Sequence, residues 1–153
     1  MLLFAFVVGC STQQISTNEI VVVDINTLLQ NPAEYSGKTI ETNAIVGDHV
    51  WVGSATGNVG SSLFLVKSLS DVEKIKEYTS NFDPAGTALA MFKNGEPITC
   101  TDYSGFGETE PSTKCSYEIN RGEMYKIKGV VKALGSGSAY GEYQIDVISW
   151  NKI

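Results

Sequence analysis

The sequence is poor in basic residues and in histidine and cysteine, the residue types that most often bind metal ions. Eleven lysines and arginines stand against seventeen acidic residues, there is a single histidine, and the net charge is −6. Such a chain repels phosphate backbones, so tight binding to nucleic acid is disfavoured. One histidine and three cysteines also fall short of the closely spaced ligand sets of structural zinc sites. We therefore expect no metal and no cofactor.

Charged residues are scarce overall, at 18%, whereas glycine is frequent, with fifteen residues. Helical bundles and coiled coils need far more Ala, Leu, Glu and Lys, so the composition favours a turn-rich, mainly β protein. A length of 153 residues, 42% of them hydrophobic, suits one globular domain with a single core.

The amino terminus carries an apolar run over residues 2–8, followed by Gly9 and Cys10 and then by a polar stretch. The run is too short to span a bilayer, which takes about 20 residues. It is typical of the apolar segment of a secretory signal, although no basic residue precedes it. A buried first strand is the alternative interpretation of the same residues.

Val7-Val8-Gly9-Cys10 resembles the lipobox of bacterial and archaeal lipoproteins. The resemblance implies that residues 1–9 are removed and that the thiol of Cys10 carries an acyl lipid such as palmitate. Residues 10–19 are then a tether and residues 20–153 the folded domain. The implied location is the outer, extracytoplasmic face of a prokaryotic cell membrane, with the membrane as the partner of Cys10.

The cysteine count supports this interpretation. Three cysteines leave one odd thiol in an exported protein, and lipidation of Cys10 leaves Cys100 and Cys115 as a pair. We expect a disulfide between these two, since exported proteins mature in oxidising compartments. A bridge over a loop of this length stabilises a fold by about 3 kcal/mol in the chain-entropy model.

Two helices are predicted from capping signals. Asp24 or Asn26 caps a short helix that ends before the Asn-Pro pair, because residues before proline avoid the α region. Ser70 and Glu73 form a capping box, which predicts a helix over residues 71–80.

Alternating apolar and polar residues predict the strands, which span residues 39–46, 49–52, 62–67, 88–92, 98–103, 124–134 and 142–150. A glycine-rich loop is expected over residues 53–60, and Asn94-Gly95 predicts a type I′ turn. The faces expected to be buried carry Ile40, Thr42, Ala44 and Val46 in one strand and Tyr125, Ile127, Gly129 and Val131 in another.

Two stretches resemble OB-fold domains of the anticodon-binding-like type. Residues 31–38 (NPAEYSGK) run straight into a strand, and residues 125–131 (YKIKGVV) fit a late strand of the same pattern. The resemblance implies a five-stranded Greek-key barrel with a helix between its third and fourth strands. Residues 83–123 exceed a minimal barrel, so we expect an extra hairpin there, with the disulfide in it.

OB-fold domains bind ligands through aromatic side chains on strands two and three and in the neighbouring loops. The candidate ligand-binding residues are therefore Trp51, Phe64, Tyr103, Phe106 and Tyr140. A core position is the favoured alternative for Phe64, because large aromatics contribute most when buried. Residues 96–123 hold six acids against Lys114 and Arg121, which favours a neutral, cationic or protein ligand.

No catalytic signature is present. His49 has no nucleophile motif to serve, and the glycine-rich stretches lack the spacing of phosphate loops. Lys126, Lys128 and Lys132 read as the solvated side of a strand. The sequence predicts a non-enzymatic, membrane-anchored OB-fold binding or interaction module. Single-stranded nucleic-acid or oligosaccharide binding is the alternative, and a barrel-type hydrolase ranks last because Arg121 is the only arginine.

Overall fold

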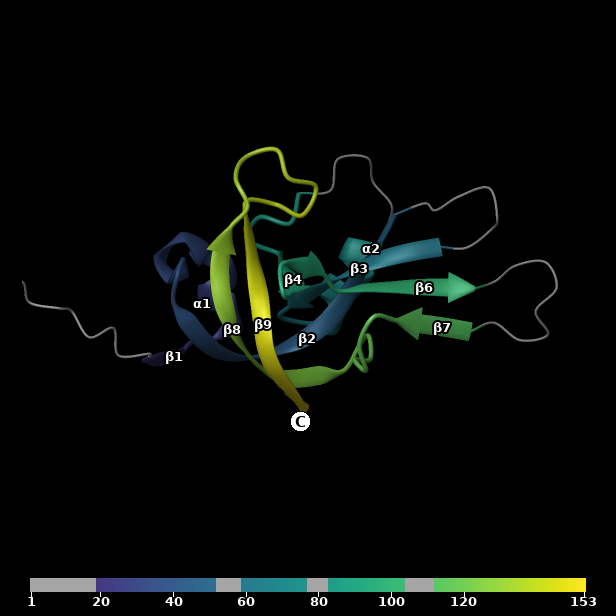
Figure 1. The fold of residues 1–153 in the computed structure, drawn as a ribbon, viewed down its shortest axis with the longest axis horizontal. Helices are drawn as coiled ribbons and strands as arrows, with labels where there is room; N and C mark the ends of the chain where they lie inside the picture. Colours follow the sequence, from purple (N-terminus) through teal and green to yellow (C-terminus); the bar gives the residue numbers. More distant parts are fainter. Residues whose placement is uncertain (1–18, 52–58, 77–82, 104–111) are drawn as a thin grey trace, which may run out of the picture.

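The computed structural model describes residues 19–51, 59–76, 83–103 and 112–153 (Figure 1). No helix in these ranges is long and apolar enough to span a bilayer. In chain order the elements are β1 (Ile20–Val22), α1 (Ile25–Gln30), the 3₁₀ helix η1 (Pro32–Tyr35), β2 (Thr39–Trp51), β3 (Val59–Val66), α2 (Leu69–Lys76), β4 (Ala88–Lys93), β5 (Glu96–Pro97), β6 (Thr99–Tyr103), β7 (Ser112–Cys115), β8 (Met124–Ala133) and β9 (Tyr143–Lys152).

Five strands close into a barrel in the order β2-β3-β4-β9-β8 and back to β2. All neighbouring pairs in this ring are antiparallel except β4 and β9, which run parallel. The expected mainly β, OB-like barrel is confirmed. β1 extends the sheet beside β2, whereas β6 and β7 continue it beyond β3 as the extra hairpin, away from the barrel (Figure 1).

One strand replaces the two predicted over residues 39–46 and 49–52, so that prediction was wrong. β2 is unbroken, pairing with β8 along its first part and with β3 along its second. Gly47 lies under helix α2, where a Cβ atom would stand only 2.7 Å from Cδ1 of Ile75. The missing side chain lets the strand pass beneath the helix without a turn.

Helix α2 lies between the second and third barrel strands, not between the third and fourth. The helix follows the second barrel strand, and not the third, because β2 is a single strand where two were predicted. The helix also begins earlier than predicted, at Leu69, because Ser68 and not Ser70 is the cap: the Asp71 N–H donates to Ser68 Oγ at 3.3 Å, and that hydroxyl donates to the Asp71 carboxylate. Residues 77–80 of the predicted helix lie outside the described residues.

Several local predictions are confirmed. The Asp24 carboxylate accepts the N–H groups of Asn26 and Thr27 at 2.9 and 3.4 Å, capping α1. Asn94 and Gly95 adopt φ values of +56° and +84° and turn β4 into β5. One boundary differs from the prediction: β3 begins at Val59, although the loop was expected to extend to residue 60.

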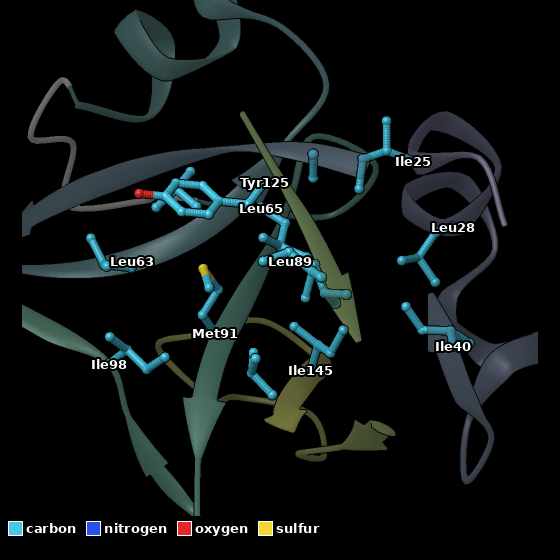
Figure 2. Close-up of a cluster of buried hydrophobic side chains, with 14 of the residues drawn as sticks. Ile25, Leu28, Ile40, Leu63, Leu65, Leu89, Met91, Ile98, Tyr125 and Ile145 are labelled. Carbon is cyan, nitrogen blue, oxygen red and sulfur yellow. The ribbon is translucent and has the colours of Figure 1, made fainter. Parts of the chain in front are cut away.

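The barrel interior is one apolar cluster, onto which α1 packs from one side (Figure 2). Leu28 of α1, Ile40 of β2, Leu63 and Leu65 of β3 and Ile145 of β9 are all 0% exposed. Burying each such side chain contributes about 1.5–3 kcal/mol. The two strand faces predicted to be buried are buried throughout, with Ile40, Thr42, Ala44, Val46, Tyr125, Ile127, Gly129 and Val131.

Candidate functional site

The outer face of β3 and β4, which OB-fold domains use for ligands, is covered in this protein. Val72 and Ile75 of α2 lie over Phe64 and Phe92 in a second apolar cluster. Tyr140, from the loop between β8 and β9, packs its ring edge-to-face on Phe92 with centroids 5.3 Å apart. This face therefore works as core.

The structure separates the aromatic residues named from the sequence. Phe64 is 1% exposed and occupies the core position favoured for it. Tyr103 is half-buried at the end of β6 in the extra hairpin, whereas Tyr140 belongs to the loop between β8 and β9. The side chain of Trp51 and all of Phe106 lie outside the described residues.

A concave site lies beside helix α1. It is a cavity of about 470 Å³, here named the α1 pocket, between the end of α1, the segment that leads into β4, and the loop before β9. Its apolar lining comes from Leu29, Pro32, Pro84, Ala88, Leu89 and Tyr143. A volume in this range with a mainly apolar lining is typical of small-molecule sites.

The charges around the α1 pocket have one sign. Asp83 and Glu142 are the ionisable carboxylates among its described lining residues, and no lysine, arginine or histidine lines it. Oδ1 of Asp83 accepts the Ala85 N–H at 2.9 Å, and within the described residues Oδ2 has no hydrogen-bond donor. The pocket disfavours anions and suits a neutral or cationic group attached to an apolar body.

Close packing of two loops holds the wall of the α1 pocket. Gly141 has a φ of +89°, and a Cβ atom there would lie 2.5 Å from Cγ of the buried Pro84. No motif in the sequence pointed to this pocket. Its only signal was the glycine, proline and serine content of the two loops, which reads equally well as ordinary turns.

Arg121 binds the carboxylates of Asp48 and Asp102, which lie far apart in the sequence. Its guanidinium donates to Asp48 at 2.7 Å, to Asp102 at 2.9 and 3.0 Å, and to the hydroxyl of Thr113 at 3.2 Å. The hydrogen bond to Asp102 and then that to Asp48 raise the pKa of Arg121 above its usual value, against the effect of burial. These contacts occupy both terminal nitrogens, so the cluster clamps the hairpin to the barrel.

The disulfide between Cys100 and Cys115 is confirmed. The two residues face each other in the register of β6 and β7, one pair along from Thr101 and Lys114. The bridge joins β7 to β6 within the extra hairpin, and the Arg121 cluster joins the hairpin to β2.

A second hollow, here named the Trp150 groove, lies where β7 leads back to the barrel. It measures about 760 Å³, and its aromatic lining is Tyr117, Tyr125 and Trp150. The rings of Tyr117 and Trp150 meet edge-to-face at 5.8 Å, and the Trp150 N–H donates to the carbonyl of Glu118 at 3.2 Å. Polar side chains surround these rings.

His49 and the lysines of β8 make contacts that join neighbouring elements of the fold. Nδ1 of His49 donates to the carbonyl oxygen of Ile75 at 2.6 Å, which ties α2 to β2. Lys126 and Lys132 make ion pairs with Glu41 and Asp146 on the neighbouring strands. Within the described ranges, no group of three or more His, Cys, Asp or Glu side chains stands close enough to hold a metal ion.

Comparison of the chain with protein-family models, with curated proteins and with solved structures finds no match.

Proposed function

We propose that this chain is a non-enzymatic binding module, anchored through lipidated Cys10 on the outer face of a prokaryotic membrane, which takes a small neutral or cationic ligand in the α1 pocket. The observation that carries the proposal is the pocket itself: an apolar cavity of about 470 Å³ whose ionisable lining groups are Asp83 and Glu142. Pockets of this kind, with a few polar groups that orient the ligand, are the usual small-molecule sites.

Two further observations support the location. The disulfide between Cys100 and Cys115 is of the kind that persists outside the cytosol. The lipobox-like Val7-Val8-Gly9-Cys10 lies ahead of a short polar tether. The anchor rests on the sequence of residues 1–18, which lie outside the described residues.

The test of the pocket uses three probes of one shape: benzylammonium, benzyl alcohol and benzoate. We expect chemical-shift changes at Ala88 and Leu89 that are largest for the ammonium and absent for the carboxylate. Glu142→Gln should weaken binding of the ammonium a few-fold, in line with a pair near the surface, and leave the alcohol unaffected. Glu96→Gln, on the exposed β5 turn, is the matched control.

Ala85→Trp should block the pocket from its exposed rim and abolish the response to all three probes. The pocket would be ruled out as the binding site if this variant responded to the probes as the parent protein does. It would also be ruled out if the parent protein bound benzoate more strongly than benzylammonium.

The anchoring has its own test. Cys10→Ser should move the full-length protein from the membrane fraction to the soluble fraction, because the acyl chain contributes about 0.8 kcal/mol per buried methylene. Continued detergent-dependent sedimentation of this variant would contradict a lipid anchor at Cys10.

A second candidate function, oligosaccharide binding, is favoured by the Trp150 groove. Aromatic rings with polar neighbours suit the apolar faces and hydroxyl groups of sugars, and OB-fold proteins include oligosaccharide binders. Trp150→Ala should then remove binding of a glycan found by array screening, whereas Glu142→Gln should not. Binding that depends on Glu142 and not on Trp150 would leave the α1 pocket as the site.

A further inference from the structure

The outer strand of the extra hairpin, β7, has an open edge. It pairs with β6 on one side, and among the described residues no strand pairs with its other side (Figure 1). An open edge presents a row of backbone N–H and C=O groups that can pair with another chain.

Thr113 and Cys115 carry the backbone groups of this edge. The N–H of Ser116 donates to the carbonyl oxygen of Thr99 on the β6 side at 2.9 Å. Successive residues of a strand point their backbone groups to opposite sides, so Lys114 also faces β6, whereas Thr113 and Cys115 face outward. Within the described residues, no backbone group bonds to the outward N–H and C=O groups of these two.

The open edge of β7 borders the Trp150 groove. Thr113 and Cys115 are both among the lining residues of this hollow of about 760 Å³, together with the rings of Tyr117 and Trp150. The groove therefore combines unpaired backbone groups with aromatic surface.

Strand β9 borders the same groove, and one of its sides is also unpaired there. Its pairing with β4 ends at Asp146, and Lys93 then donates to the carbonyl oxygens of Val147 and Ile148 at 3.1 and 3.0 Å. On the side away from β8, no described backbone group bonds to residues 150–152, which line the groove. Two strands thus meet the groove with unpaired backbone.

Unpaired strand edges select an extended polypeptide as the occupant. Its N–H and C=O groups alternate with the strand rise of about 3.3 Å per residue, whereas a sugar has no donors and acceptors at that regular spacing. A second copy of this chain is disfavoured, because the register that places Thr113 of each copy opposite Cys115 of the other also places the two Lys114 side chains opposite each other.

We propose that the Trp150 groove is a docking site for an extended segment of another protein, which adds to the sheet beside β7. The backbone of the segment exchanges hydrogen bonds with Thr113 and Cys115, and apolar side chains at alternate positions contact the rings of Tyr117 and Trp150. This docking site is separate from the α1 pocket and does not depend on the lipid anchor at Cys10. A peptide here takes the place of the sugar in the second candidate function.

The test screens a display library of random linear heptapeptides against the full chain with its disulfide intact. We expect the selected peptides to share apolar residues at alternate positions. The strongest binder is then made in two N-methylated versions, each without the amide protons along one edge of the extended peptide. At least one version should bind about ten-fold more weakly or worse, because strand pairing needs those donors. Two versions that bind as tightly as the unmodified peptide would overturn the proposal.

Thr113→Pro tests the same contact from the side of the protein. Proline removes the outward N–H and leaves the pairing of Lys114 with β6, since proline is tolerated on an edge strand where the missing donor faces solvent. The variant should bind the selected peptide about ten-fold more weakly or worse. Thr113→Val is the matched control: both variants lose the hydroxyl contacts with Asp102 and Arg121, but valine keeps the N–H and should bind as the parent does.

Thermal unfolding of both variants checks that they are equally folded, and the α1 pocket should bind benzylammonium equally in the two. Equal peptide binding by the proline and valine variants would overturn the docking site and leave the proposed function untouched. Failure to select any peptide, with a glycan bound through Trp150, would give the groove to the second candidate function. A dimer of the chain that Thr113→Pro converts to a monomer would give the edge to a second copy, which also overturns the proposal.

Discussion

Arg121 and Asp48 are 73 positions apart in the chain, yet the guanidinium donates a hydrogen bond of 2.7 Å to a carboxylate side chain that is only 3% exposed. The contact joins the segment before β8 to barrel strand β2, and Asp102 completes it from β6. A buried charge of this kind is tolerated because its partner is fixed by further hydrogen bonds.

Arg121→Leu should destabilise the fold by about 3–5 kcal/mol, because it leaves the Asp48 carboxylate buried and without its ion-pair partner. Urea denaturation at neutral pH measures the loss. The double variant Asp48→Asn with Arg121→Leu should recover part of it, since the stranded charge is gone. A single variant as stable as the parent would show that the clamp contributes nothing.

Ser68→Ala should lower stability at neutral pH by about 0.5–2 kcal/mol, the usual effect of losing a helix cap. The hydrogen bond from Ser68 holds the pKa of Asp71 below its usual value, with a smaller contribution from Lys74 and against desolvation. A lowered folded-state pKa adds stability above the unfolded value of about 3.9, and this is lost as the pH falls through the folded-state pKa.

The difference between Ser68→Ala and the parent should therefore shrink in acid. Denaturation curves at neutral pH and below the folded-state pKa of Asp71 measure it. A difference that grows on acidification would contradict the assignment of Ser68 as the main cause.

Reduction of the Cys100–Cys115 bridge should add the mass of two hydrogens and destabilise the domain by about 3 kcal/mol in the chain-entropy model. Intact-mass measurement and thermal unfolding with and without reductant check both. Free thiols at both positions in the native protein would contradict an oxidising location.

Gly141→Ala should destabilise the loop that forms a wall of the α1 pocket and weaken binding of benzylammonium there. The alanine meets two penalties, a positive φ and a Cβ contact with Pro84 at 2.5 Å. Gly135→Ala is the matched control, because Gly135 has a φ of +89°, open space around its Cβ position and no place in the lining of the pocket. The positive φ should lower the free energy of unfolding of each variant by about 1–3 kcal/mol. Gly141→Ala should lower it further because of the contact with Pro84. Equal losses would show that the contact with Pro84 is not strained.

Local features followed from the sequence because their causes lie within a few residues. The carboxylate of Asp24 reaches amides two and three positions on, and Asn94-Gly95 tolerates the backbone of its own turn. The alternation from Tyr125 to Val131 identified the buried face of β8, since side chains alternate along any strand. The pairing of Cys100 with Cys115 followed from the count of three cysteines together with the lipobox resemblance, which set Cys10 aside.

Tertiary structure decided what depends on closure of the barrel. β2 remains one strand because Gly47 passes beneath α2, and Phe64 lies in the core because that helix covers it. The α1 pocket combines Leu29, Pro84 and Gly141, and the clamp combines Asp48, Asp102 and Arg121. Periodicity and capping act over about four residues, whereas these groups meet only when strands distant in the chain pair with one another.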